Sequence, residues 1–323
     1  MASAGDCPKS RTIMIANLPP GATARVADGR ASLILDVTGL SEADADAREA
    51  AARAACAAAG IDEVRVARTA QRTTRRLIAV ASGKGGVGKS TVSANLAVAL
   101  ARRGRPVGLV DADIAGPSQP RLFGVEDVKP EARENRMVPV ETAAGVPIVS
   151  MGMLVPQGQA IAWRGPMLGN ALGQLIDAHW GAADPLILDL PPGTGDVQLT
   201  MVQKYRPAGA VIVSTPQDLA LIDARRAIDL FVKASIPLIG LVENMAGYAC
   251  PQCGAVSDPF GSGGAEAEAA RLGIDFLGRI PLSIAVRTAS DAGTPPAAGN
   301  GEGAAAFEAV GARVDHWLRA NGG

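Results

Sequence analysis

The sequence predicts a doubly wound, mostly parallel α/β fold for residues 73–323, preceded by a small α+β domain in residues 1–72. The first observation is a series of short apolar runs rich in Val, Ile and Leu, with helical segments between them. Such runs are typical of parallel strands that helices cover on both faces. The second observation is that several runs end in polar, Gly or Pro residues, which line the ligand crevice of a doubly wound sheet. In chain order the runs are "LIAVAS", "PVGLVDAD", "VPIVSMG", "PLILDLPP", "AVIVSTP", "PLIGLVENM" and "FLGRIPL".

The composition allows a large core and disfavours several partners. The chain of 323 residues is 48% hydrophobic but only 3% aromatic, so its core must be mainly aliphatic. Lysines and arginines are scattered and the net charge is -1, which disfavours nucleic acid because phosphate binding needs concentrated positive charge. No uninterrupted apolar run reaches roughly 18 residues, the length that indicates a membrane span, and we find no secretion signal. We therefore expect a cytoplasmic protein with no membrane partner.

The predicted small domain contains two strands and one helix. "RASLILDVTGL" and "DEVRVAR" are interpreted as strands, and "EADADAREAAARAACAAAG" as an Ala-rich helix that Gly60 closes. Cys56 falls within this helix and is interpreted as a buried packing residue, whereas Cys7 is a terminal thiol. The polar, basic stretch "TAQRTTRR" at residues 69–76 predicts a linker.

The stretch "GKGGVGKS" at residues 83–90 fits the phosphate-binding pattern G-x-x-x-x-G-K-[ST]. The strand-like "LIAVAS" precedes it and the amphipathic "TVSANLAVALARRG" follows it. Glycines let backbone N–H groups surround a phosphate, and the helix N-terminus adds a favourable dipole. Lys89 is suited to neutralise β- and γ-phosphate oxygens, and the Ser90 hydroxyl to ligate Mg²⁺. The predicted nucleotide-binding residues are Gly83, Lys84, Gly85, Gly86, Val87, Gly88, Lys89, Ser90 and Thr91.

Lys84 is a second lysine, early in this loop. One interpretation is a solvated loop lysine. The alternative is that it reaches the phosphates of another subunit, where an added cation stabilises the transferring phosphoryl group as an arginine finger does. A lysine at this position defines the deviant Walker A loop, K-G-G-x-G-K-[ST].

Carboxylates follow two of the predicted strands. Asp111 and Asp113 lie in "LVDADIAGPS", and Asp189 ends the run "LILDLPPGTGD". We assign Asp189 to the Mg²⁺ side of the reaction and Asp113 to the attacking water, because one strand-end carboxylate can hold the metal while another orients water. Capping of a turn remains an alternative, above all for Asp111. Asn244 follows "PLIGLV"; its amide can pair with an adenine edge or form an Asx turn.

Cys250 and Cys253 form a Cys-x-x-Cys pair in "CPQCG". The spacing lets two thiolates approach one metal, and a cluster or a structural zinc site normally takes four ligands. His179 and His316 are the only histidines and neither is near in sequence. A thioredoxin-like redox pair would open a helix, whereas "CGAVSDPFGSGG" is predicted to continue as a loop. Metal binding is favoured, with a redox pair or an inert loop as alternatives.

Seven motifs in residues 77–295 resemble those of the Mrp/ApbC-type iron–sulfur cluster carrier ATPases, within the MinD/NifH-like class with a deviant Walker A loop. The cysteine pair and the segment after Asp189 separate this family from partitioning and septum-positioning relatives. The matching segments are "SGKGGVGKST", "VDADIAGPS", "RGPM", "LILDLPPGTGDVQLT", "STPQDLALIDARRAI", "GLVENMAGYACPQCG" and "LGRIPL".

The resemblance implies a homodimeric ATPase that hydrolyses ATP slowly, binds a [4Fe–4S] cluster transiently and transfers it to apoproteins. Cys250 and Cys253 would ligate the cluster, and a twofold axis would bring two pairs together as a four-thiolate site. The remaining implied roles are Lys84 as signature lysine, Lys89 as Walker A lysine, Asp113 and Asp189 as switch I and switch II carboxylates, and Asn244 at adenine.

Two parts of the chain leave alternatives open. The N-terminal segment resembles the MIP18-type domain only poorly, because "DVTGLSEADAD" lacks the cysteine that this domain usually carries. A ParA/MinD-like positioning module would need a basic surface or an amphipathic membrane helix, for which Phe307, Val310, Val314 and Trp317 offer one apolar face. We favour packing of that face into the core. Besides a cluster carrier and a positioning module, a NifH-like ATP-driven reductase is the third possible function.

Overall fold

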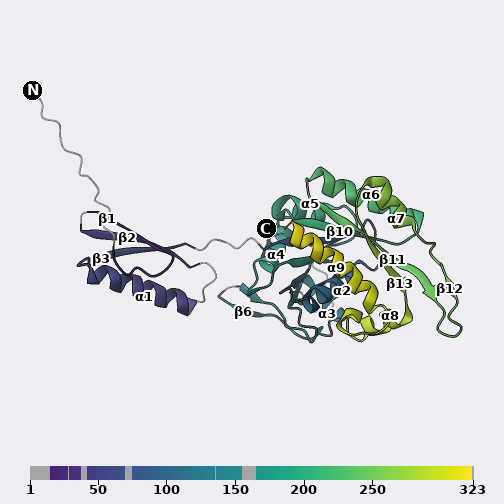
Figure 1. Cartoon of the computed structure of the whole chain (residues 1–323), viewed down its shortest axis with the longest axis horizontal. Helices are drawn as coiled ribbons and strands as arrows, with labels where there is room; N and C mark the ends of the chain where they lie inside the picture. The colour runs from purple at the N-terminus through teal and green to yellow at the C-terminus, as the bar shows by residue number, and fades with distance from the viewer. Residues whose placement is uncertain are drawn as a thin grey trace, which may run out of the picture. The chain divides into compact units, whose positions relative to one another are not determined.

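The computed structural model describes residues 15–27, 29–37, 42–69, 75–134, 136–154 and 165–321. The chain divides into two compact units, residues 1–74 and 75–323. Figure 1 shows both units, and each is described by itself below. None of the helices in the described ranges has the length and apolar character needed to cross a membrane.

The first unit is a three-stranded sheet with one helix. Strand β1 (Ala22–Ala27) pairs antiparallel with β2 (Arg30–Asp36), and β2 pairs parallel with β3 (Glu63–Thr69). Helix α1 (Glu42–Ala58) connects the two parallel strands. Alternate residues of β2 are buried, including Leu33 and Leu35, and Cys56 of α1 is fully buried in the same cluster. The interpretation of Cys56 as a packing residue is therefore confirmed, whereas β1 was not predicted and Cys7 lies outside the described residues.

The second unit is built on one mixed sheet that is almost entirely parallel. Its strands run in the order β12-β11-β10-β4-β9-β5-β8 in the described part of the chain, and β13 pairs with β11. All of these pairs are parallel except β11 with β12. The predicted doubly wound α/β class is thus confirmed. The bounds are β4 Leu77–Ala81, β5 Gly108–Asp111, β8 Ile148–Ser150, β9 Leu186–Asp189, β10 Gly209–Ser214, β11 Leu238–Ala249, β12 Val256–Ser257 and β13 Phe276–Leu282.

Two layers of helices cover the sheet, one on each face (Figure 1). Alternate residues of β4 point to opposite faces, so Ala79 packs with α4–α7 and Ile78 with α2 and α9. The first layer is α4 Gly165–Ile176, α5 Asp196–Tyr205, α6 Asp218–Lys233 and α7 Gly264–Leu272. The second contains α2 Lys89–Arg102 and α9 Ala304–Ala320. Shorter elements are α3 Gln119–Leu122, α8 Ile284–Asp291, the hairpin β6 Glu131–Arg133 with β7 Arg136–Val138, and the 3₁₀ turns η1 Met151–Met153 and η2 Pro296–Ala298.

The C-terminal helix belongs to the core. Phe307, Val310 and Val314 of α9 are each at most 1% exposed and pack with α2 in one apolar cluster. Gly311 permits this close approach, because a Cβ at that position would lie 2.6 Å from the Cβ of Ala99. The predicted core face of α9 is confirmed, and this face is not available for a membrane surface.

Candidate functional site: a phosphate loop beside a strand that ends in two cysteines

The phosphate loop connects β4 to α2, as its motif predicts. Gly86 and Gly88 have φ values of 80° and 78°, the left-handed region that favours glycine, and Gly88 caps α2. Gly83 serves another purpose, since a Cβ there would lie 2.0 Å from the backbone carbonyl carbon of Asp223 in α6. The first glycine of the motif therefore lets α6 pack against the start of the loop.

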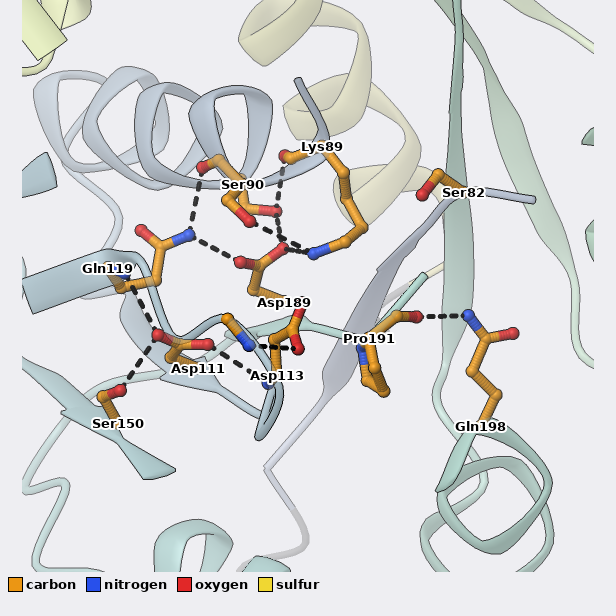
Figure 2. A network of polar contacts seen from close by, with 12 residues as sticks. Ser82, Lys89, Ser90, Asp111, Asp113, Gln119, Ser150, Asp189, Pro191 and Gln198 are labelled. Carbon is orange, nitrogen blue, oxygen red and sulfur yellow. Dashed lines mark hydrogen bonds and ion pairs between the residues drawn. The ribbon is translucent and has the colours of Figure 1, made fainter. Parts of the chain in front are cut away.

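Lys89 and Asp189 form a buried ion pair at the centre of the site (Figure 2). The Lys89 Nζ donates to Asp189 Oδ1 at 2.5 Å and to Ser90 Oγ at 3.2 Å. The two side chains are 5% and 0% exposed, so neither charge is shared with water. The lysine expected to bind phosphates is thus neutralised by the carboxylate that ends β9. We expect the phosphates of a bound nucleotide to compete with Asp189 for this charge.

Two further side chains hold Asp189, and the sequence interpretation missed both. Ser93 Oγ donates to Asp189 Oδ1 at 2.8 Å, and Gln119 Nε2 donates to Asp189 Oδ2 at 2.8 Å. The same Gln119 nitrogen also donates to the Ser90 carbonyl at 3.0 Å. Ser93 lies four residues after Lys89, on the same helical face. A serine among aliphatic residues at this position was the sequence signal that could have indicated a polar contact beside Lys89. Gln119 carries no comparable signal.

Asp111 and Asp113 shape the loop after β5 (Figure 2). Asp111 is fully buried and accepts hydrogen bonds from Ser150 Oγ at 2.9 Å and from the backbone N–H groups of Gln119 and Asp113 at 3.1 and 3.2 Å. Burial, and then the charge of the nearby Asp189, raise the pKa of Asp111 to about 7. These contacts are those of a turn cap, the alternative kept open for this residue. Asp113 is 7% exposed and its Oδ1 accepts from two backbone N–H groups that follow it.

The loop after β9 contacts the phosphate loop directly. The Gly193 N–H donates to the Ser82 carbonyl at 2.9 Å, and Ser82 Oγ donates to the Lys84 carbonyl. Gln198, in the first turn of α5, donates to the Pro191 carbonyl at 2.6 Å. The half-buried Lys84 side chain has no ion pair within the described residues, and Gly85 and Gly86 are exposed at the rim. These hydrogen bonds link the loop after Asp189 both to the phosphate loop and to the first turn of α5.

Asn244 lies against the phosphate loop. It is 7% exposed, and its Nδ2 donates to the Val87 carbonyl at 2.8 Å. A Cβ on Gly88 would lie 2.1 Å from the same nitrogen, so glycine is required for this contact. Asn244 belongs to β11, whose pairing with β10 ends at Glu243 and which continues to Ala249.

Cys250 and Cys253 lie in the turn between β11 and β12. The Cys250 N–H donates to the Ala255 carbonyl at 2.9 Å, and the Gly254 N–H donates to the Cys250 carbonyl at 2.8 Å. Cys250 is half-buried and Cys253 is exposed. Hydrogen bonds from the backbone N–H groups of Cys253 and Gln252, followed by the Cys253 side chain, lower the pKa of the Cys250 thiol. The short strand β12 was not predicted, since this segment was expected to be a loop.

In the part of the chain that the structure describes, the thiols have no further ligands nearby. Within the described ranges no group of three or more His, Cys, Asp or Glu side chains is placed to hold a metal. His179 bonds the Arg133 carbonyl through Nε2 at 2.8 Å, and His316 is exposed on α9. A structural zinc site formed with these histidines is thus not assembled. The cysteines also do not begin a helix, as a thioredoxin-like pair would.

The fold and this loop together define a P-loop nucleoside triphosphatase. The chain belongs to the ParA family of NUBPL iron-transfer P-loop NTPases, whose model matches residues 73–314. It is 50% identical over 226 residues to an iron-sulfur cluster carrier protein of Pseudomonas fragi. The matched region covers 69% of this chain and 78% of that protein. The resemblance inferred from the sequence motifs is thereby confirmed.

Solved structures with the same fold include nucleotide-bound and cell-division proteins. A nucleotide-binding protein from Archaeoglobus fulgidus in complex with ADP is 40% identical, with a TM-score of 0.61, covering 68% of this chain and 87% of that one. The cell division ATPase MinD of Pyrococcus furiosus is 25% identical, with a TM-score of 0.54, covering 75% and 99%. The chain thus shares its fold with a nucleotide-binding protein and with a cell division ATPase.

Proposed function

We propose that this chain is an ATP-hydrolysing carrier of iron–sulfur clusters. In this proposal two copies hold one [4Fe–4S] cluster between them and deliver it to apoproteins, with slow hydrolysis coupled to delivery. The family assignment and the carrier name of the Pseudomonas fragi relative support the cargo. The ADP in the Archaeoglobus fulgidus structure supports the nucleotide site.

One observation carries the proposal: a single strand connects the two sites. Asn244 of β11 bonds the phosphate loop, and Cys250 follows the end of the same strand. Five residues separate them along the chain, and an irregularity with left-handed Met245 and Gly247 lies between them. A nucleotide that moves the phosphate loop therefore acts on a strand whose far end carries the thiols. By linkage, loading of the cluster alters nucleotide binding to the same degree.

The nucleotide site has the donors that a magnesium nucleotide requires. The Ser90 hydroxyl and the Asp189 carboxylate are hard oxygen donors, the kind Mg²⁺ prefers, so both residues fit this metal. Bound Mg²⁺ would neutralise charge on the phosphates. Lys89 would then bind phosphate oxygens, and Asp113 would orient the attacking water. The half-buried Lys84 has no ion pair within the described residues and is assigned to the phosphates of a second copy.

The number of cysteines at the turn is the reason that the proposal requires two copies of the chain. Iron–sulfur clusters are typically held by four thiolates. Each chain presents two at an exposed turn, since Cys56 is buried in the other unit and Cys7 is outside the described residues. A twofold dimer doubles the pair into a four-thiolate site at the axis. Cargo held between two exposed turns is released when the copies separate, as a carrier requires.

Anaerobic reconstitution with iron and sulfide, combined with measurement of molar mass, tests this function. The wild-type chain is expected to hold about four iron and four sulfide per dimer. Cys250→Ser and Cys253→Ser should each abolish the cluster, whereas the control Cys56→Ala should retain it. Lys89→Ala should stop hydrolysis and still load a cluster. If the Cys250/Cys253 double variant binds the same cluster, the proposal is wrong.

A further inference from the structure

A groove of about 720 Å³ lies between α5 and α6, and none of the residues that line it belongs to the phosphate loop or to the cysteine turn. Figure 1 shows these two helices as neighbours in the layer that covers one face of the sheet. Apolar side chains form its floor, among them Leu199, which is 40% exposed, and Val202, which is buried. The residues that line it are Thr194, Leu199, Val202, Gln203, Arg206, Arg226, Asp229, Leu230, Lys233 and Ala234.

The side chains that line this groove carry a net positive charge. Its lining carries three cations, Arg206, Arg226 and Lys233, against one carboxylate, Asp229. Lys233 pairs with Asp229 at 2.6 Å, and Arg226 pairs with Asp223 at 3.1 Å, outside the lining. Arg206 ends α5 in the left-handed region and has no ion pair within the described residues. An occupant that complements this surface is apolar along one face and acidic along its edges.

One wall of the groove is joined to the nucleotide site. Thr194, in the loop that follows Asp189, lines the groove, and α5 begins two residues later. Gln198 fastens the first turn of α5 to the Pro191 carbonyl of that loop. We expect a bound nucleotide to compete with Asp189 for Lys89 and so to shift this loop together with α5. The width of the groove should then differ between the nucleotide-free and nucleotide-bound chain.

We propose that this groove, named here the α5–α6 groove, docks an acidic amphipathic helix of the apoprotein that receives the cluster. Naming the recipient rests on the proposed carrier function. A second copy of this chain fits less well, since a twofold contact through the groove would set one net-positive surface against an identical one. Helix α5 has ten residues and is about 15 Å long, so roughly three turns of a partner helix fit beside it. Such a contact is small, as suits a partner that must leave after each transfer.

A binding experiment on the full chain tests the groove without any cluster. The probe is a fluorescent 14-residue amphipathic peptide with leucines on one face and glutamates on both flanks; a second peptide carries lysine in place of each glutamate. We expect the acidic peptide to bind at least about tenfold more tightly, with a further change when a non-hydrolysable ATP analogue and Mg²⁺ are added. Arg206→Glu and Leu199→Asp should each weaken binding about tenfold, the factor that 1.4 kcal/mol represents.

The control is Arg133→Glu, the same charge reversal at an exposed position of β6 whose side chain is outside the groove. It should bind the acidic peptide as the wild type does. Equal affinity for the two peptides, or wild-type affinity in both groove variants, overturns the proposal. A fall in dimer mass in Arg206→Glu also overturns it, because the groove would then be an interface between copies.

A transfer experiment tests the identity of the occupant. The reconstituted chain is mixed with an apo-[4Fe–4S] dehydratase whose activity returns on cluster insertion. The groove variants should load cluster and hydrolyse ATP normally but transfer at least about fivefold more slowly, and the acidic peptide should inhibit the wild type. Wild-type transfer rates in both groove variants refute the recipient as occupant. Failure of the wild type to load a cluster instead refutes the proposed function, and peptide binding remains a separate result.

Discussion

The packing of α6 on the phosphate loop makes one glycine irreplaceable for a reason unrelated to phosphate. We predict that Gly83→Ala destabilises the second unit severely. The added Cβ would meet the backbone carbon and oxygen of Asp223 at 2.0 Å and the Ala224 nitrogen at 2.6 Å. Non-bonded carbon atoms prefer about 3.5–4.0 Å, so the loop and the helix must separate by roughly 1.5 Å.

The cost of this separation can be estimated from the residues involved. Overpacking by a methylene usually costs about 1–3 kcal/mol when side chains can adjust. Here the obstacle is backbone, and α6 is anchored by buried residues such as Ala224 and Phe231. We therefore expect a loss of about 3 kcal/mol or more, which lowers the melting temperature of a unit of this size by roughly 6–12 °C.

Urea unfolding followed by tryptophan fluorescence measures this loss in the second unit alone. All three tryptophans, Trp163, Trp180 and Trp317, lie in residues 75–323. The matched control is Gly85→Ala, where the nearest atom to a new Cβ is 3.9 Å away. The control should unfold within about 1 kcal/mol of the wild type. If Gly83→Ala is as stable as Gly85→Ala, the packing argument is refuted.

Three further predictions concern β11, α7 and the cysteine turn. Asn244→Ala removes the hydrogen bond to the phosphate loop; it should cost about 1 kcal/mol and weaken ADP binding several-fold in a titration, and an unchanged affinity would contradict the contact. Hydrogen bonds from Arg225 and Arg271 hold the pKa of Glu268 at about 2, below its usual 4.5. The charged carboxylate therefore stabilises the fold above pH 4.5 and loses this effect as the pH falls toward 2. Glu268→Gln should cost about 1–2 kcal/mol at pH 7, less than the full shift implies because the arginines are half exposed, and urea titrations should show the difference vanishing near pH 2; a pH-independent difference would count against it. In the reduced, cluster-free chain, Cys250 should react with iodoacetamide at pH 7 faster than Cys253, as peptide mass spectrometry can measure, and equal rates would show that the turn does not activate it.

The sequence predicted those features that short-range spacing determines. The phosphate loop, the carboxylates at the ends of β5 and β9, and runs such as "FLGRIPL", which is β13 itself, follow from local patterns. The position of the predicted ligand crevice followed from the rule that the carboxyl ends of parallel strands meet at one edge of the sheet. These predictions needed no knowledge of which helix packs on which loop.

The features it did not predict depend on contacts between distant segments. Gln119 lies 70 residues from Asp189, and Ser150 lies 39 residues from Asp111, so no local pattern places these donors beside the carboxylates. Strand β12 has two exposed residues and no alternation, and it forms only because β11 extends beyond its pairing with β10 and offers a partner. The α5–α6 groove likewise arises from the spacing of two helices, which their sequences do not encode separately.

The buried pair of Lys89 and Asp189 also bears on the form of nucleotide that we expect the chain to accept. Drawing the ammonium group toward phosphates would leave a fully buried carboxylate beside Asp111 without its counter-ion, and an uncompensated buried charge costs several kcal/mol. In the proposed nucleotide site, a divalent cation that arrives with the nucleotide would restore a counter-ion to Asp189. We therefore expect the affinities for metal and nucleotide to rise together, and metal-complexed nucleotide to bind more tightly than free nucleotide.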